Sequence, residues 1–326
     1  MNPMLQGLIT IIVGVGGCMG YFYLSNLVLD RYIFPAKGPK IGENITRANQ
    51  IRPWLFLFPA IFALGLYLVY PVIGSFWRAL FNRPGTEFLG LGNYAALFAD
   101  SEFQSSLFAN FLWVIVVPAA ATFCGLLAAQ LTDRLTWGNI AKSLIFMPMA
   151  ISFVGASLIW KFVYANNADI GLINAVRAFF GAQNPVDVLQ IPFWNNFFLM
   201  VILIWIQTGF AMVILSAALR GIPEETVEAA VLDGANPFQI FFRIKVPQIM
   251  GTILVVWTTI TILVLKVFDI VYATTGGNFG TQILPSYMMA YMFRDDGRAT
   301  AVAFVIMVIV LPVMIWNIMQ ARKELR

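Results

Sequence analysis

The chain has 326 residues, of which 60% are hydrophobic and 11% are charged, and its formal net charge is +4. A soluble domain usually carries about 25% charged residues, so this composition argues against a soluble globular protein. Several apolar runs are long enough to cross a bilayer, and none shows the short alternating pattern of a transmembrane barrel. We therefore expect an all-α membrane protein. No Lys/Arg cluster is interleaved with aromatic residues, so we expect no nucleic-acid partner.

Apolar spans follow one another along the chain. We place seven of them, at residues 4–29, 54–77, 107–131, 140–164, 194–219, 249–275 and 299–320. The first span is too long for the apolar region of a signal peptide and no Lys or Arg precedes it, so we expect a retained helix. The sequence thus predicts a polytopic helical bundle in the lipid bilayer. Residues 1–50 would form an extra N-terminal helix and linker, and residues 51–326 the main transmembrane domain.

The loops between the spans differ in charge. Lys and Arg are concentrated in loops 30–53, 132–142, 220–248 and 321–326, and are sparser in 78–106, 165–193 and 276–298. Cytoplasmic loops of membrane proteins carry the excess of basic residues. This bias predicts an N-terminus on the outer side and a C-terminus in the cytoplasm. The outer loops are too short for a folded domain, although short interfacial helices would fit in them.

The sequence lacks the residues that most catalytic sites need. It contains no histidine and no Gly-Lys-Ser/Thr phosphate-binding loop, and its two cysteines, Cys18 and Cys124, lie inside apolar runs. We therefore expect no catalytic residue, no metal site and no cofactor on this chain. If ATP is involved, another polypeptide binds it. A membrane enzyme is thereby disfavoured.

The basic loop at 220–247 carries the signals of two short helices. Pro223 suits the first turn of a helix, and Glu224 and Glu225 would lie at the positive end of the helix dipole. Gly234 is expected to end this helix in a left-handed conformation. A face of small residues on the same helix is formed by Ala229 and Ala230.

A second short helix is expected after Gly234. Asn236 and Pro237 suit its N-cap and first position, and Pro247 is expected to end it. Three aromatic residues would form an apolar knob that the chain alone leaves uncovered: Phe238, Phe241 and Phe242. The alternative is a structured loop that packs on its own bundle.

The loop also resembles a known motif. Glu228-Ala229-Ala230, followed by Gly234, Ile244 and Pro247, is similar in spacing to the EAA motif of permease subunits of binding-protein-dependent ABC importers. Val246 departs from it, because the motif usually has leucine there. The resemblance implies a coupling helix that is seated in a cleft of a separate ATPase. The residues implied in this coupling are Glu228, Ala229, Ala230, Asp233, Gly234, Pro237, Phe238, Ile244 and Pro247.

A wider resemblance covers about residues 50–326. The stretches 234–247, 266–269 and 275–277 are similar to carbohydrate-type permeases of the kind that forms the first subunit of maltose and α-glucoside importers. This resemblance implies a second homologous permease as a heterodimer partner, two ATP-binding subunits that hold ATP and magnesium, a periplasmic solute-binding protein and a sugar substrate. Larger members carry a sizeable periplasmic insertion that this chain lacks, so the binding protein would dock on the short outer loops.

Polar residues inside the spans mark a candidate translocation path. Lys266 and Asp269 are three residues apart in one predicted span and would share a helix face, either lining the path or forming a structural ion pair. Gln207 supplies both a donor and an acceptor, as sugar hydroxyls require. The resemblance places three residues at or near substrate-contacting positions: Ile206, Gln207 and Phe210. For any single aromatic residue, core packing is the alternative.

The favoured function is therefore the permease subunit of an ATP-driven ABC importer in a bacterial inner membrane. The subunit would catalyse no covalent chemistry, and within the resemblance we favour an α-glucoside disaccharide as its cargo. The alternative is an ion-coupled secondary transporter that uses Lys266 and Asp269. Inverted repeats would support that alternative, and hydropathy shows none.

Overall fold

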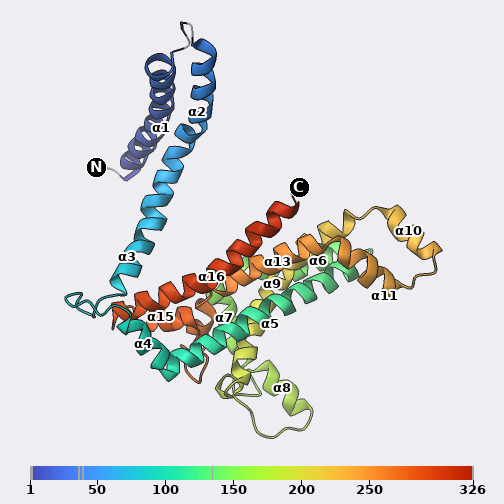
Figure 1. Ribbon diagram of the computed structural model, residues 1–326. Coiled ribbons are helices and arrows are strands. Elements are labelled where there is room, and N and C mark those ends of the chain that lie inside the picture. Colours follow the sequence, from blue (N-terminus) through green and yellow to red (C-terminus); the bar gives the residue numbers. More distant parts are fainter. Residues whose placement is uncertain (1–2, 36, 39, 134, 325–326) are drawn as a thin grey trace. The chain divides into compact units, whose positions relative to one another are not determined.

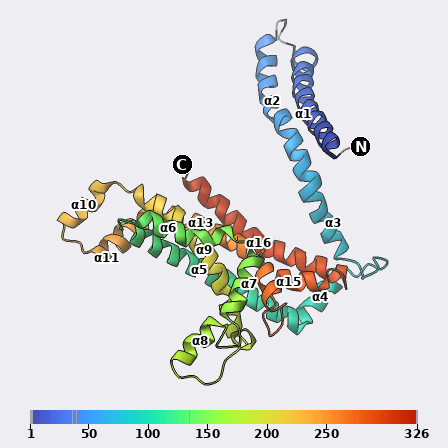
Figure 2. The ribbon, with the colours of Figure 1, turned by 180° about the vertical axis from the view of Figure 1, so that it is seen from behind.

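The computed structural model of the chain describes residues 3–35, 37–38, 40–133 and 135–324. These residues are helical apart from turns, loops and one isolated bridge between Phe81 and Phe88. The prediction of an all-α fold is confirmed. Contacts divide the chain into two compact units, residues 1–74 and 75–326, which are described separately below and are drawn from two sides in Figures 1 and 2. The domain boundary predicted at residue 50 differs from this division after residue 74, and it stays a prediction.

The first unit is a pair of helices joined by a tight turn. Helix α1 (Pro3–Val28) continues through a π-helical turn, η1 (Leu29–Ile33), and α2 (Ile41–Leu64) continues through a second, η2 (Gly65–Val69), into α3 (Tyr70–Arg78). Residues 75–78 of α3 already belong to the second unit. The hydroxyl of Tyr21 donates a hydrogen bond to the carbonyl of Leu55 at 2.9 Å, which ties α1 to α2. The apolar windows of both helices are exposed within the unit, as expected for surfaces that meet lipid or another protein.

The second unit contains the remaining helices. They are α4 (Gly92–Ala99), α5 (Ser101–Thr132), α6 (Gly138–Phe146), η3 (Met147–Ala150), α7 (Phe153–Val163), α8 (Leu172–Phe179), η4 (Val188–Gln190), α9 (Trp194–Arg220), α10 (Glu224–Leu232), α11 (Pro237–Ile240), η5 (Phe241–Lys245), α12 (Val246–Gln248), α13 (Met250–Val264), α14 (Asp269–Thr274), α15 (Leu284–Tyr291) and α16 (Asp296–Glu324). Each of the three predicted outer loops contains a short helix, namely α4, α8 and α15, so that expectation is confirmed.

Five of the seven predicted spans are single helices, the span 140–164 is a bent pair, and only residues 250–264 of the span 249–275 belong to the second bent pair. Among the described residues, five helices are long and apolar enough to cross a membrane, and seven spans result if each of two bent pairs counts as one. The pair α6–η3 and α7 bends by 105°, where Ser152 caps the N-terminus of α7 by accepting from the N–H of Gly155. The segment α11–α12 and α13 bends by 70° at Ile249. Hydropathy does not register the first of these bends, because the residues around it are almost all apolar. The second bend lies where the predicted span 249–275 begins.

The second predicted span is longer than the sequence indicated. Its helix begins at Ile41 rather than near residue 54. Residues 41–52 are mostly polar, so an apolar window misses them, yet polar residues with good helix propensity continue a helix into water.

The core of the second unit lies where α5 packs along α9, with α13 against both. The close approach depends on Gly125, because a Cβ atom there would lie 2.4 Å from the Cβ of Ala211 and 2.8 Å from the backbone nitrogen of Met212. Small residues allow helix backbones to approach in this way inside membranes. Buried side chains that fill the interface include Trp113, Leu199, Met200, Ile202, Leu203, Met212 and Leu215.

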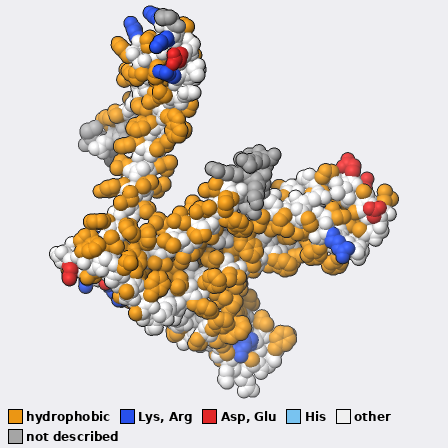
Figure 3. Space-filling view, viewed as in Figure 1, with side chains coloured by type: hydrophobic (Ala, Val, Ile, Leu, Met, Phe, Trp, Pro, Cys, Tyr) orange, Lys and Arg blue, Asp and Glu red, His pale blue; other side chains and the backbone are white. Residues whose placement is uncertain are grey.

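Charged side chains gather at the ends of helices. Figure 3 shows apolar side chains along the helix lengths, and charged ones around the turn after α1 and over α10. At the end of the second unit predicted to be outside, Asp100 caps α5 and accepts hydrogen bonds from the Tyr287 hydroxyl at 3.0 Å and the Arg298 guanidinium at 3.3 Å. Arg78 forms a two-point ion pair with Asp296 at the same end. These bonds join the ends of α3, α5, α15 and α16.

Candidate coupling loop and translocation path

The predicted helix–glycine–helix is present in the loop after α9. Helix α10 runs from Glu224 to Leu232, with both first-turn glutamates at its positive end. Pro223 is the N-cap residue rather than the first helical one, which is a shift of one position from the prediction. Gly234 has φ +80° and follows the C-cap Asp233, as expected for a helix stop that an L side chain disfavours.

The start of the second helix is held by a reciprocal pair of hydrogen bonds. The Asn236 side chain accepts from the N–H of Gln239 at 2.9 Å, and the Gln239 side chain accepts from the N–H of Asn236 at 2.9 Å. Pro237 occupies the first turn of α11, as predicted. This capping box satisfies the first N–H groups of α11 and fixes the residue at which this helix begins.

The prediction that Pro247 ends the second helix is wrong. The helical path continues from Pro237 through Gln248, and Pro247 lies inside its last part. Proline has no N–H to donate, and the preceding residues Phe241–Lys245 form a π-helical turn, in which Val246 donates to the carbonyl of Phe241. The bend that separates the loop from α13 comes at Ile249 instead.

The loop leaves large apolar side chains uncovered. Leu232 is 88% exposed and Phe238 is 77% exposed, with Val231 and Phe242 also exposed. Phe241 differs from the predicted knob, because it packs against the core of the bundle. The predicted small-residue face is also split, since Ala229 is exposed and Ala230 is buried. The exposed carboxylates around this surface are Glu224, Glu225, Glu228 and Asp233.

A charge cluster fixes the helix ends beside the loop. The carboxylate of Asp133, just after α5, pairs with the ammonium of Lys142 on α6. It also accepts from the Ser216 hydroxyl at 2.9 Å and from the Arg220 guanidinium at 3.2 Å, both on α9. The side chain of Asp133 is 22% exposed, and that of Lys142 is 14% exposed. The cluster therefore holds the ends of three helices together where the loop begins.

The ionisation of Asp133 follows from these contacts. Burial raises the pKa of its carboxyl, but hydrogen bonds from Lys142 and Ser216 and the positive charges of Lys142 and Arg220 outweigh burial. The resulting pKa lies below its ordinary value. The carboxyl is therefore ionised at neutral pH and binds both cations as a carboxylate.

A pocket of about 550 Å³ lies between the cluster and the coupling loop. Its charged lining comes from Asp133 and Arg220 on one side and from Glu224, Glu228 and Lys245 on the other. Lys245 also approaches Gln130 of α5, at 3.5 Å. Neither Asp133 nor Lys142 was among the site residues predicted from the sequence. The sequence signal for both residues is that opposite charges lie near the ends of predicted spans, within predicted cytoplasmic loops.

The predicted path residues on α9 lie inside the bundle of this chain. Ile206 is buried and Gln207 is 5% exposed, and Phe210 packs against the same core. Neighbouring Trp205 meets Trp160 of α7 edge to face, with ring centroids 5.7 Å apart. The structure thus brings the three α9 residues together, and their role in substrate contact stays a prediction.

The predicted sharing of one helix face by Lys266 and Asp269 is wrong. Helix α13 ends at Val264, Lys266 lies in the turn after it, and Asp269 is the first residue of α14. The break arises where the backbone tightens, since the N–H groups of Lys266 and Val267 donate to carbonyls three residues earlier. Lys266 is exposed and Asp269 is half-buried. Helix α14 packs against α7 and α9.

Polar groups on α5 were not selected from the sequence. Asn110 is 3% exposed, its side-chain oxygen has no hydrogen-bond partner among the described residues, and it lines a pocket of about 490 Å³ with Gln104 and Phe108. Gln104 and Phe108 also line an adjoining pocket of about 400 Å³ beside Phe193. Phe193 has φ +69°, a strained conformation for a bulky residue. The sequence signal for Asn110 was a single amide side chain within the predicted apolar span 107–131.

Two solved structures share this fold. A bacterial ABC transporter involved in the import of the acidic polysaccharide alginate matches with a TM-score of 0.69 and 20% identity, over 87% of this chain and 99% of that chain. The bacterial alginate ABC transporter in complex with alginate pentasaccharide-bound periplasmic protein matches with a TM-score of 0.72 and 20% identity, over 87% and 98% of the two chains. At this identity the similarity shows a shared fold and nothing more.

The family follows from sequence similarity. The model of the binding-protein-dependent transport system inner membrane component matches residues 121–324. The alpha-glucoside transport system permease protein AglF of Rhizobium meliloti is 60% identical, with 99% of both chains covered. The osmoprotective compounds uptake permease protein GgtC of Synechocystis is 46% identical, over 83% of this chain and all of the relative. The trehalose/maltose transport system permease protein MalF of Thermococcus litoralis is 30% identical, over 83% of this chain and 95% of the relative.

The chain therefore belongs to the family of inner membrane components of binding-protein-dependent transport systems. It is a multi-pass membrane protein and a transport subunit. The resemblance drawn from the loop motif is confirmed by these matches, and they give no support to the alternative of an ion-coupled secondary transporter.

Proposed function

We propose that the chain is one of two permease subunits of an ATP-driven sugar importer, coupled to a separate ATPase through residues 220–247. The observation that carries the proposal is the exposed apolar surface of this loop, with Leu232 and Phe238 at its centre. Gly234, in a left-handed conformation, and the Asn236 capping box define the turn between its two helices. An uncovered apolar surface with a charged rim is typical of a docking site.

The coupling residues have distinct roles in this proposal. Glu228 and Ala229 face outward on α10, and Phe238 faces outward on α11, so these three meet the ATPase. Asp233 and Gly234 set the turn between the two helices. Ala230 and Ile244 support the loop from its own side, since Ala230 is buried and Ile244 is half-buried, and Pro247 is an exposed residue near the bend into α13. ATP and magnesium bind to the partner, and the subunit itself carries out no covalent chemistry.

Force applied to α10 reaches the spans through the Asp133 cluster. The cluster ties Arg220, at the end of α9, to α5 and α6. A displacement of the loop therefore moves three helix ends together rather than one. This arrangement suits a rocking motion between inward-open and outward-open states, in which packed helices move as a body.

The remaining assembly follows from the same proposal. The loop 220–248 lies in the cytoplasm, with the C-terminus, and the N-terminus lies outside. A periplasmic solute-binding protein docks on the outer loops that contain α4, α8 and α15. A second, homologous permease completes the path. The charge bias of the loops and the family support this orientation and composition.

The proposed cargo is an α-glucoside such as maltose, sucrose or trehalose. The relative that covers 99% of this chain at 60% identity is an alpha-glucoside transport permease, and a more distant one is a trehalose/maltose permease. The proposed path residues are Ile206, Gln207 and Phe210 on α9, Lys266 in the turn between α13 and α14, and Asp269 at the start of α14. The uptake of labelled disaccharides by cells that express the full transporter tests the cargo. Uptake of none of these disaccharides would exclude this substrate class without touching the coupling proposal.

Gly234→Ala tests the coupling role. The substitution strains the left-handed turn and tilts α11 away from α10, while the site around Gly234 is open enough for a Cβ atom. We expect sugar uptake and sugar-stimulated ATPase activity to fall at least about tenfold, with normal membrane insertion. The matched control is Gly38→Ala, because Gly38 also has a positive φ (+88°) in open space but lies in the turn between α1 and α2. Equal activity of the two variants would contradict the coupling role.

A further inference from the structure

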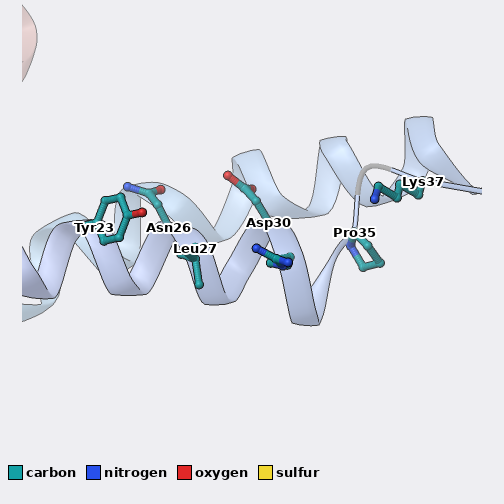
Figure 4. A pocket seen from close by; sticks show the side chains of 7 residues that line it. Tyr23, Asn26, Leu27, Asp30, Pro35 and Lys37 are labelled. Carbon is teal, nitrogen blue, oxygen red and sulfur yellow. The ribbon is translucent and has the colours of Figure 1, made fainter.

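The turn between α1 and α2 encloses a pocket that the transport proposal does not use. The pocket has a volume of about 600 Å³ and is lined by Tyr23, Asn26, Leu27, Asp30, Arg31, Pro35 and Lys37. Figure 4 shows Tyr23, Asn26, Leu27 and Asp30 following one another along the end of α1, with Pro35 and Lys37 on the turn beyond it. Asn44 of α2 fixes the turn by donating to the carbonyl of Pro35 at 3.0 Å.

The charges around this pocket do not cancel. The acidic residues here are already paired within the unit: Asp30 with Arg52, through two oxygens at 2.7 and 2.9 Å, and Glu43 with Arg47. Three exposed cations have no carboxylate partner among the described residues, namely Arg31, Lys37 and Lys40. The pocket therefore presents positive charge that its own neighbourhood leaves unneutralised.

The pocket lies where the apolar helix α1 gives way to a charged turn. Before the pocket, α1 carries exposed apolar residues such as Leu24, and after it the turn carries Lys37 and Lys40. Tyr23 on α1 and Trp54 on α2 are also exposed. Tyr and Trp gather at headgroup depth because one end of each ring system is apolar and the other is polar. A ligand in this pocket therefore has water on one side and hydrocarbon on the other.

We propose that this pocket binds the phosphate headgroup of an anionic membrane lipid, such as phosphatidylglycerol. Arg31 and Lys37 hold the phosphate, and the Tyr23 hydroxyl, which has no hydrogen-bond partner among the described residues, supplies a further donor. Leu27 and the exposed apolar side of α1 below the pocket receive the acyl chains. The apolar floor favours a lipid over a free phosphate compound, since a small polar solute gains nothing from it.

Asp30 sets the strength of the site. Its carboxylate lines the pocket, yet both oxygens are engaged by Arg52, so it repels a phosphate less than a free carboxylate would. Removing the charge of Asp30 releases Arg52 and takes a negative charge from the pocket at the same time. Asp30→Asn is therefore expected to strengthen the binding of an anionic lipid, which a purely structural role of the pair would not produce.

Native mass spectrometry of the full-length chain in detergent tests the site. Phosphatidylglycerol and phosphatidylcholine with the same acyl chains are added, and the retained lipid is counted. We expect the wild-type chain to prefer phosphatidylglycerol, and Arg31→Gln with Lys37→Gln to lower that preference about 20-fold, since each near-surface cation contributes to anionic lipid affinity. Arg31→Lys retains most of the preference, because the charge remains.

The matched control removes equal charge elsewhere. Arg83 and Arg294 are exposed and belong to loops at the other predicted face, so Arg83→Gln with Arg294→Gln keeps the wild-type preference. An equal loss in both double variants would overturn the proposal, because it would show unspecific attraction to positive charge. Added glycerol phosphate separates the two sources of the headgroup: if it binds as tightly as the lipid, the occupant is a soluble phosphate compound and the lipid assignment is wrong.

Discussion

The coupling loop and the middle of α9 are both rich in apolar residues, yet they place them in opposite environments. In the loop, Leu232 and Phe238 are exposed, although buried Ala230 and the inward-packed Phe241 anchor the same segment to the bundle. In α9, Ile206 and Gln207 are enclosed by α5, α13 and neighbouring helices. Side chains in the middle of α9 therefore stabilise this chain itself, whereas the exposed side chains of the loop are available to stabilise an assembly.

The first prediction tests the buried region and has the largest expected effect on the stability of the chain. Gly125→Leu places side-chain atoms where Ala211 and the backbone of Met212 already lie. Overpacking of this kind costs about 1–3 kcal/mol or more, and here the backbone itself is in the way, so most of the protein should aggregate. Size-exclusion chromatography in detergent measures the loss. Gly14→Leu in α1, where a Cβ meets nothing within 4 Å, should remain monodisperse; similar profiles for both would show that α5 and α9 do not pack closely.

The second prediction concerns the junction between the two regions. Asp133→Ala leaves the ammonium of Lys142 partly buried without its carboxylate and frees the end of α9. The loss of a charged hydrogen bond costs about 2 kcal/mol, so the thermal unfolding midpoint in detergent should fall. Asp169→Ala removes an exposed carboxylate with no ion pair among the described residues and should leave the midpoint unchanged. A midpoint that Asp133→Ala does not lower would exclude the cluster as a structural clamp.

The third prediction is a smaller effect of pH at the same cluster. The pKa of Asp133 is lower in the folded chain than in the unfolded one, so the unfolded chain binds more protons as pH falls. The stabilisation is complete above the unfolded pKa of about 3.9 and is lost as pH falls through the folded value. Asp133 should therefore cause no change in the free energy of unfolding between pH 8 and about pH 5. Thermal unfolding midpoints measured across this pH range test this expectation. Below about pH 4, the midpoint should fall less steeply with pH in Asp133→Asn than in the wild type.

The fourth prediction concerns a substitution that should hardly change the stability of the isolated chain but should reduce its function in the transporter. Leu232→Ser removes an exposed apolar side chain, and surface substitutions usually change stability by less than about 0.5 kcal/mol. The thermal midpoint of the isolated chain should therefore match that of the wild type, while co-purification of the ATPase and sugar uptake decline. A lower midpoint with normal co-purification would mean that Leu232 packs within its own chain.

Several features were accessible from the sequence because their signals are local. Pro237, Gly234 and Asn236 specify a helix stop and a helix start through backbone chemistry that involves neighbours a few residues away, and the structure confirms both. The span count was likewise accessible, since hydropathy accumulates along about 20 residues. The bend between α6–η3 and α7 was missed, because the residues around it are apolar and a hydropathy window registers no change there. The break after Val264 was also missed, because Lys266 and Asp269 are only two charges in a long apolar run and do not end a hydropathy span.

Partnerships between distant residues were not accessible. Asp133, Lys142 and Arg220 lie in three separate segments, and nothing in their spacing says that one carboxylate meets both cations. The same holds for Asp100, Tyr287 and Arg298 at the opposite end. Lys266 and Asp269, in contrast, looked like partners from their spacing alone, and the break between α13 and α14 removes the shared face on which that expectation depended.

The sequence alone predicts a helical membrane protein with several apolar spans and a loop that resembles the coupling element of an importer permease. Composition, hydropathy and backbone propensity decide these features, and each acts over a short stretch of chain. Tertiary structure alone decided which side chains are available to partners. Phe241 packs inward while Phe238 remains exposed, although both are phenylalanines in the same short segment. Exposure depends on where α5, α9 and α13 pass, and that is set by packing between residues far apart in the chain.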